Sequence, residues 1–283
     1  MRVSFETVNG VHTRILAAGD GPDSLIAIHG GGLTADVYVR NLDALGRDRL
    51  VLAPDLPNSG FSGELPGAGP FLPRLRDFLL EFADRFASGR CALLGNSLGA
   101  QMAVLLHLAD PVRFGELVLT PSATAFHEGK QLQTALQDTL SRSMPATGSA
   151  IDMRREFEGL RYLCPSLTDA SDILTSLATA HALPHYGPRL RSMLLDLTDL
   201  SRNGEYYVAD RLAEITARVL IVWGRRDPRT VYSDIQSRVA HLQNTAMVTF
   251  DDAGHMPFLE DPDRFNRTVA AFLVSVGGTA PTI

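Results

Sequence analysis

Continuous apolar runs, each closed by glycine, proline or aspartate, recur along the chain. They cover residues 24–28, 50–53, 91–94, 117–119, 219–223 and 247–250. Runs of this length are typical of parallel strands that are buried on both faces. Near the N-terminus, residues 2–8 and 11–17 flank Asn9-Gly10, which predicts a hairpin of two further strands. The pattern therefore predicts an eight-stranded, mostly parallel sheet.

Helical periodicity alternates with these runs. Amphipathic patterns cover residues 71–86, 98–108, 231–242 and 262–276. Strands that alternate with helices predict an α/β fold with right-handed crossovers and helices on both faces of the sheet.

The alternation stops between residues 122 and 211. Four helical patterns occur there, punctuated by prolines, at 129–142, 150–163, 169–182 and 188–200. We therefore expect a core domain of residues 1–121 and 212–283. Residues 122–211 are predicted to form a helical cap, or lid, over the C-terminal edge of the sheet.

Composition narrows the class of protein. The chain has 283 residues, 45% of them hydrophobic and 20% charged, which is ordinary for a soluble globular protein. A net charge of −6 argues against nucleic-acid binding. The N-terminus does not resemble a signal peptide and no apolar run reaches membrane-spanning length, so we expect a cytoplasmic protein without a membrane partner. No metal-ligand spacing occurs, so neither a metal nor a cofactor is expected; a homodimer stays open.

The segment Gly95-Asn96-Ser97-Leu98-Gly99 joins an apolar run to a helical pattern and matches G-x-S-x-G. A sharp strand-to-helix turn of this kind projects the serine hydroxyl above the edge of the sheet. It also leaves the N–H of the next residue, Leu98, at the helix N-terminus, where it can donate to an oxyanion. The sequence therefore predicts Ser97 as a nucleophile.

A serine nucleophile needs a base and a carboxylate that orients the base. His255 lies in the loop after the last apolar run, and Asp227 lies just beyond the run 219–223. Active sites of open α/β sheets lie at the carboxyl ends of the strands, where both residues are expected. Taken alone, each residue could equally be an ordinary loop or turn residue. The chain order Ser97, Asp227, His255 is the order of α/β-hydrolases and favours a triad.

Five segments carry a resemblance to a known family: HGGG at 29–32, PDLPNSGFS at 54–62, GNSLGA at 95–100, VLIVWGRRDP at 219–228 and AGHMPFLEDP at 253–262. The chain resembles the serine-nucleophile α/β-hydrolases, in the branch of the meta-cleavage-product hydrolases and related esterases. The resemblance implies an oxyanion hole formed by the backbone N–H groups of Leu98 and Gly31, with Gly32 as the alternative to Gly31. Glycine permits the close backbone approach that this role requires.

The chemistry and substrate are less sharply defined. Ser97 replaces the aspartate nucleophile of haloalkane dehalogenases and epoxide hydrolases, which argues against both. Asn96 is shared with C–C bond hydrolases, but those enzymes carry tryptophan where this chain has Met256. We expect hydrolysis of an ester, thioester or lactone with a mainly apolar acyl or ring portion. Asn96, Phe126, Phe157 and Met256 are the predicted substrate contacts, although lid residues of this kind more often form core.

Several other functions remain open on the same scaffold. They are a C–C bond hydrolase, a cofactor-free haloperoxidase, a non-hydrolytic lyase or cyclase of secondary metabolism, and a small-molecule receptor.

Overall fold

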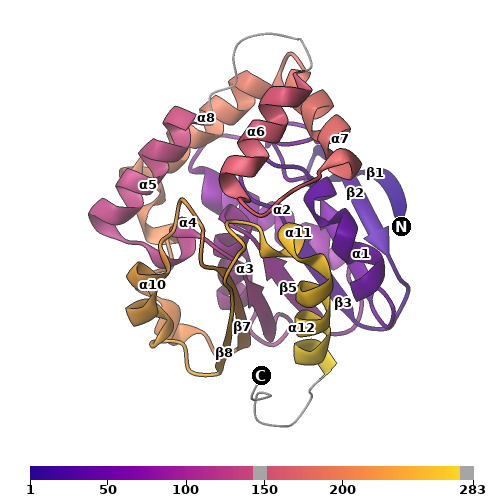
Figure 1. The fold of residues 1–283 in the computed structure, drawn as a ribbon, viewed down its shortest axis with the longest axis vertical. Helices are drawn as coiled ribbons and strands as arrows, with labels where there is room; N and C mark the ends of the chain where they lie inside the picture. Colours follow the sequence, from indigo (N-terminus) through magenta and orange to yellow (C-terminus); the bar gives the residue numbers. More distant parts are fainter. Residues whose placement is uncertain (143–151, 275–283) are drawn as a thin grey trace.

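The computed structural model describes residues 1–142 and 152–274 of the chain. At its centre lies an eight-stranded sheet with the strand order β1-β2-β4-β3-β5-β6-β7-β8 (Figure 1). The strands are β1 Arg2–Val8, β2 Val11–Ala18, β3 Ser24–Ile28, β4 Leu50–Pro54, β5 Cys91–Gly95, β6 Glu116–Leu119, β7 Arg218–Gly224 and β8 Thr245–Phe250. All eight predicted strands are therefore present, with ends shifted by at most two residues.

Strand direction brings the predicted site to one edge of the sheet. β1 and β2 pair antiparallel, β2 pairs antiparallel with β4, and every later pair is parallel. Ile28 of β3 lies opposite Gly95 of β5, which in turn lies opposite Leu119 of β6. β7 and β8 end together, at the pair Gly224 and Phe250. The segments that follow these strands therefore start side by side.

Helices cover both faces of the sheet and form two apolar cores with it. α2 (Phe71–Phe86) and α3 (Leu98–Ala109) belong to one core, and α1 (Val39–Leu45) and α12 (Pro262–Val274) belong to the other. The remaining elements of this part of the fold are α4 Ala123–Phe126, α10 Tyr232–Val239, α11 Pro257–Glu260 and the 3-10 helices η1 Ala35–Tyr38, η2 Gly204–Tyr206 and η3 Leu212–Glu214. The mostly parallel sheet with helices on both faces confirms the predicted fold class.

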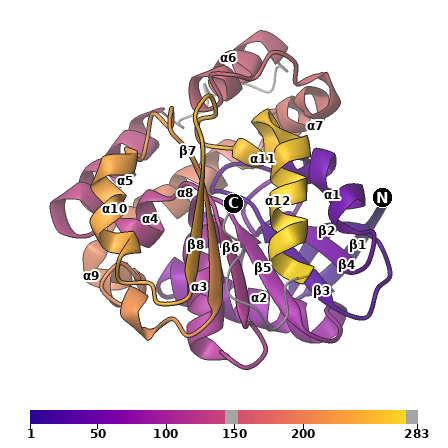
Figure 2. The ribbon, with the colours of Figure 1, turned by 60° about the horizontal axis from the view of Figure 1, so that its bottom comes forward.

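Four longer helices, which we call the cap helices, lie between β6 and β7 in the sequence. They are α5 Gly129–Arg142, α6 Met153–Leu163, α7 Ser171–Ala182 and α8 Tyr186–Thr198, and the short α9 Leu200–Asn203 follows them. Figures 1 and 2 show the cap helices gathered at one end of the molecule, beyond the strands.

The cap helices start near the predicted positions. α6 begins after Asp152, whose side chain accepts the N–H of Arg155, so it starts three residues later than the pattern 150–163. α8 begins at Tyr186, and Pro188 lies in its first turn, where the missing N–H costs no helical bond. Residues 150, 151, 275 and 276, at the ends of two predicted helices, lie outside the described residues.

No helix in the described part of the chain is both long and apolar enough to cross a membrane.

Candidate active site

Ser97 lies in a strained turn between β5 and α3. Its backbone has φ 54° and ψ −119°, a conformation that costs a residue with a side chain about 1–3 kcal/mol. Neither of the two flanking glycines leaves room for a side chain. A Cβ on Gly95 would lie 2.4 Å from the carbonyl oxygen of Gly99, and one on Gly99 would lie 1.9 Å from that of Ile28. The G-x-S-x-G pattern is thus explained by close backbone packing around the serine.

Hydrogen bonds from the segment after β6 hold this turn. The N–H of Ser97 donates to the carbonyl of Pro121 at 3.0 Å. The carbonyl of Ser97 accepts the hydroxyl of Ser122 at 2.7 Å and that of Thr124 at 3.4 Å. These bonds fix the backbone of Ser97, which restricts where its hydroxyl can lie.

The carboxylate of Asp227 binds the imidazole of His255. The His255 Nδ1 lies 3.0 Å from Oδ1 and 3.1 Å from Oδ2 of Asp227, and both side chains are almost fully buried. A carboxylate only accepts, so the proton is assigned to Nδ1 and the lone pair to Nε2. His255 is therefore held in the tautomer that a general base requires.

The two other aspartates near His255 face solvent. Asp251 pairs with Arg225 at 2.8 Å and Asp252 pairs with Arg226 at 2.5 Å, and 78% of each aspartate side chain is exposed. Asp227, as the sequence predicted, is the carboxylate brought to His255.

The loop that carries His255 is fixed on three sides. Its N–H donates to the carbonyl of Leu163 in α6 at 2.7 Å, and its carbonyl accepts the Asn96 side-chain amide at 3.0 Å. The preceding N–H, of Gly254, donates to the Glu260 carboxylate at 2.7 Å. A Cβ on Gly254 would lie 2.3 Å from the Leu163 carbonyl oxygen, so only glycine permits this contact.

Gly31 and Leu98 lie next to each other beside Ser97. A Cβ on Gly31 would lie 3.7 Å from Cδ2 of Leu98 and 3.3 Å from Cε of Met193. Within residues 1–142 and 152–274, neither the N–H of Gly31 nor that of Leu98 donates to a protein acceptor. Both residues line the same cavity as Ser97.

Gly32, the alternative donor, has its carbonyl group engaged by the cap helices. The carbonyl accepts the hydroxyl of Tyr186 at 2.7 Å and Nε2–H of His181 at 3.0 Å. His181 in turn places Nδ1 2.8 Å from the Glu156 carboxylate. The glycine loop is therefore attached to α6, α7 and α8 as well as to the core.

His29 anchors the start of the glycine loop. Its Nε2 accepts the N–H of Leu56 at 2.9 Å, and Nδ1–H donates to the carbonyl of Gly30 at 2.7 Å. Burial lowers the pKa of His29 below its usual value, more strongly than the nearby charge of Asp55 raises it. The imidazole is therefore neutral, and its hydrogen bonds connect the loop after β3 to the loop after β4.

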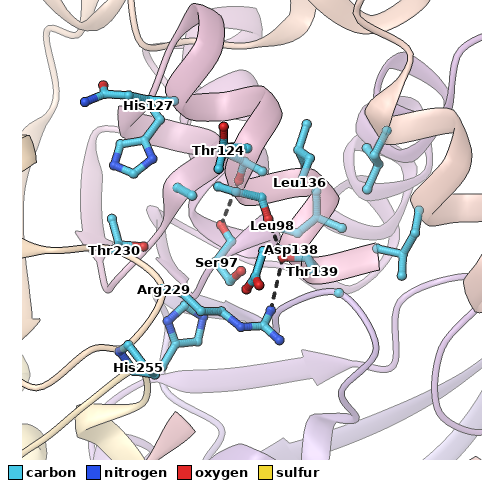
Figure 3. A pocket seen from close by; sticks show the side chains of 18 of the residues that line it. Ser97, Leu98, Thr124, His127, Leu136, Asp138, Thr139, Arg229, Thr230 and His255 are labelled. Carbon is cyan, nitrogen blue, oxygen red and sulfur yellow. Dashed lines mark hydrogen bonds between the residues drawn. The ribbon is translucent and has the colours of Figure 1, made fainter. Parts of the chain in front are cut away.

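Two cavities meet at Ser97 and His255. The larger has a volume of about 570 Å³ and the smaller about 230 Å³. Ser97, His255, Gly31, Tyr162 and Arg229 line both of them. Figure 3 shows Ser97, Leu98 and His255 in the wall of one of these pockets. A ligand whose reacting atom lies at Ser97 can therefore extend in two directions.

The lining of the larger cavity is mixed in polarity. Leucines from α5 and α8 contribute apolar surface, and threonines, His127 and charged side chains contribute polar surface. The sequence led us to expect a mainly apolar site. Within the described residues, no group of three or more His, Cys, Asp or Glu side chains is placed to hold a metal ion.

The four predicted substrate contacts lie away from both cavities in the described structure. Asn96 is fully buried and donates to Thr120 and to the His255 carbonyl. Phe126 packs edge-on against Trp223, with ring centroids 5.7 Å apart. Met256 is fully buried, and Phe157 packs against the same core as Met256. Other residues form the walls of both cavities, and none of these four residues is among them.

Sequence reasoning overlooked three polar residues at the site, namely His127, Arg229 and Thr230. His127 belongs to no motif, and Arg229 and Thr230 lie two and three residues after Asp227. All three residues lie shortly after the end of a strand, and this separation was the one signal in the sequence that could have identified them. Glu260, which holds the loop of His255, was likewise overlooked although it lies within one of the five quoted segments.

The chain is similar to known hydrolases over most of its length. The model of the alpha/beta hydrolase family matches residues 25–268. A 2-hydroxy-6-oxononadienedioate/2-hydroxy-6-oxononatrienedioate hydrolase from Cupriavidus pinatubonensis is 30% identical over 268 residues, which cover 90% of this chain and 88% of that protein.

Two solved structures share the fold. The meta-cleavage product hydrolase from Pseudomonas fluorescens IP01 has a TM-score of 0.78 at 20% identity, covering 95% of this chain and 97% of its own. Carboxylesterase CesB from Bacillus subtilis has a TM-score of 0.75 at 20% identity, covering 97% and 92%. With the family match over most of the sequence, the conclusion is that this chain belongs to the alpha/beta hydrolase family.

Proposed function

We propose that this hydrolase cleaves a carboxylic ester, thioester or lactone through an acyl-enzyme on Ser97. The observation that carries the proposal is the bond between buried Asp227 and Nδ1 of His255, next to a serine in a strained turn. That arrangement leaves Nε2 of His255 free to take a proton, which is what an unactivated hydroxyl needs in order to attack a carbonyl.

The reaction follows from these positions. His255 Nε2 takes the Ser97 hydroxyl proton as Oγ bonds to the acyl carbon, and the negative charge moves to the carbonyl oxygen. The N–H groups of Gly31 and Leu98 donate to that oxygen. His255 then gives its proton to the leaving oxygen or sulfur as the acyl–heteroatom bond breaks. Water, deprotonated by His255, attacks the acyl-enzyme, and Ser97 is regenerated as the acid leaves.

The two cavities suit a substrate with two portions. Because Ser97 and His255 line both cavities, an acyl portion can occupy one cavity while the leaving portion occupies the other. The unequal volumes, about 570 and 230 Å³, favour portions of unequal size. Walls that surround the substrate also strengthen the contacts of the oxyanion by excluding water.

We propose that residues 122–211 act as a lid that selects the substrate. Side chains of all four cap helices line the cavities. Leu136 from α5 and Leu194 from α8 line the larger cavity, Leu177 from α7 lines the smaller, and Tyr162 from α6 lines both. Changes in these residues should alter KM and substrate range more than the reactivity of Ser97. That the lid moves during the reaction stays a prediction.

The test combines labelling with turnover. The purified chain is treated with a fluorophosphonate probe and assayed on p-nitrophenyl esters of increasing acyl length. We expect labelling and hydrolysis in the natural chain, loss of both in Ser97→Ala, and neither loss in Ser4→Ala, which changes an exposed serine of β1. A folded natural chain that is not labelled would refute an acylating serine. Labelling without turnover of any ester would favour a non-hydrolytic role or a receptor.

C–C bond hydrolysis is the second candidate, because the relative at 30% identity is named for hydrolysis of 2-hydroxy-6-oxononadienedioate. The same compound separates the two candidates. If the chain consumes it with a higher kcat/KM than any ester, C–C cleavage is the activity. We expect esters to be preferred, since Met256 stands where the resemblance places tryptophan in the C–C hydrolases.

A further inference from the structure

Two buried polar side chains outside the candidate triad line the larger cavity. His127 follows α4, and Thr230 lies three residues after Asp227 in the segment beyond β7. Both line the cavity that contains Ser97, and Figure 3 shows them on the same side of that pocket. The neighbouring Phe126 is packed against Trp223, which fixes the backbone that carries His127.

Neither side chain has a hydrogen-bond partner within the described residues. His127 is 6% exposed and Thr230 is 0% exposed. Both ring nitrogens of His127 and the hydroxyl oxygen of Thr230 are buried without a partner among residues 1–142 and 152–274. A polar atom that is left unpaired away from water destabilises the protein. Three such atoms beside one cavity point to a polar ligand group there.

The charge around this pair favours an uncharged ligand group. Burial lowers the pKa of His127, and the charge of Arg238 lowers it further. These effects outweigh the charges of Asp234 and Asp227, which raise it, so the ring is neutral. A neutral imidazole offers one donor and one acceptor, and a threonine hydroxyl also offers both.

The charged side chains lining the cavity, apart from the histidines, are balanced. Lys130 and Arg229 are matched by Asp138 and Asp234. The wall therefore gives no net attraction to an anion or a cation.

We propose that His127 and Thr230 bind a hydroxyl group of the substrate, on the portion that occupies the larger cavity. A hydroxyl donates once and accepts twice, so one such group can bind the Thr230 hydroxyl and one ring nitrogen of His127. The substrate class is thus a hydroxylated ester or related acyl compound. This assignment rests on the proposed function, because it describes the substrate of the same site.

The experiment compares matched substrates that differ in one group. Aryl esters carrying a hydroxyl, a methyl, a methoxy or a carboxylate substituent are prepared, with the substituted ring on the acyl side in one series and on the alcohol side in the other. The readout is the ratio of kcat/KM for the hydroxyl compound to kcat/KM for the methyl compound. Because both kcat/KM values are measured on the same variant, their ratio does not depend on the fraction of that variant that is folded.

In one of the two series, the natural chain should prefer hydroxyl over methyl by about tenfold or more, which is the value of one to two neutral hydrogen bonds. The ratio should fall to about one in Thr230→Val and in His127→Phe, and Thr230→Ser should keep it because the hydroxyl remains. Thr134→Val removes an exposed hydroxyl from the same cavity wall and should leave the ratio at its natural value.

Three results would overturn the inference while leaving ester hydrolysis intact. They are a hydroxyl-to-methyl ratio near one in both series, an undiminished ratio in Thr230→Val, and a preference for the methoxy or carboxylate compound. Absence of turnover on every ester would instead overturn the proposed function, and this assignment with it.

Discussion

Asp227 and His255 are 28 residues apart in the chain, and they meet because β7 and β8 are adjacent and end at the same edge. Asp227→Asn should lower kcat by about 10⁴-fold with little change in KM, because an amide favours the wrong imidazole tautomer. Asp252→Asn is the matched control, since its carboxylate is exposed and pairs with Arg226. Steady-state kinetics on the best ester decide the matter. A large loss in the control with a small loss at Asp227 would reverse the assignment.

Asn96 is adjacent to Ser97 in the sequence, but its side chain contacts the loop of His255. Its amide donates to the carbonyl of His255, so Asn96→Ala should lower kcat by about tenfold or more and also lower the unfolding temperature. Asn41→Ala provides the control, because the Asn41 amide is equally buried and donates to the carbonyl of Phe258. Both variants should lose stability, but only Asn96→Ala should lose kcat. Equal kcat in the two folded variants would remove Asn96 from the positioning of His255.

Residues that flank the candidate triad were harder to place than the triad residues themselves. The positions of Asp227 and His255 could be predicted because strand ends and chain order fix where they lie. Asn96 and Met256 were predicted to contact substrate because they flank Ser97 and His255, yet successive side chains in a tight loop point in different directions. Both point into the protein, and the sequence contains no signal for that direction.

At the scale of elements, α7 is attached to the core by polar contacts along its length. Arg40 binds the Asp172 carboxylate through two nitrogens, at 2.7 and 2.8 Å. The hydroxyl of Ser176 donates to the carboxylate of Asp36 at 2.8 Å, and His181 reaches the glycine loop. The cap helix that touches the candidate oxyanion site is therefore positioned by the core.

The packing of α4 makes Phe126 a structural residue. Phe126→Ala should destabilise the protein by about 3–5 kcal/mol, because it leaves a cavity beside the buried Trp223. The half-buried Phe157 serves for comparison, and Phe157→Ala should cost less. Urea unfolding measures both. If Phe126→Ala left stability unchanged and broadened the range of acyl lengths, the side chain would face substrate after all.

Elements with a strong pattern were predicted well, and their packing was not. The inner strands β3, β5 and β7 are buried on both faces, so each reads as a continuous apolar run. α1 was not predicted, because seven residues carry too little periodicity and no side-chain cap. The four helices of residues 122–211 were predicted, but apolar faces of that kind can pack in several ways. Which of their side chains line a cavity therefore required the structure.

At the scale of the whole molecule, stability depends on pH through buried His29. Its pKa lies below the value of 6.5 that it has when unfolded, so the unfolded chain binds more protons between the two pKa values. The free energy of unfolding should therefore be constant above about pH 6.5 and fall as the pH decreases through that range. The stability that the neutral ring provides is lost upon protonation, because the charged ring would be buried.

A non-titrating variant isolates this contribution. His29→Gln keeps an acceptor for the N–H of Leu56 and carries no ionisable group. Urea unfolding from about pH 7.5 to about pH 5.5 should give a smaller fall in the variant than in the natural chain. His127 is present in both proteins, so its contribution to the pH dependence cancels when the two are compared. Parallel curves would show that His29 makes no difference to the pH dependence.

The proposed hydrolysis requires a transient covalent bond between the acyl group and Ser97. The most direct measurement is rapid acid quenching of the chain with a p-nitrophenyl ester, followed by digestion and mass spectrometry of the peptide that contains Ser97. We predict a burst of nitrophenol stoichiometric with the chain and the acyl group on Ser97, with both absent in Ser97→Ala. Continued turnover with no acyl group on Ser97, or with the acyl group on another residue, would contradict the account.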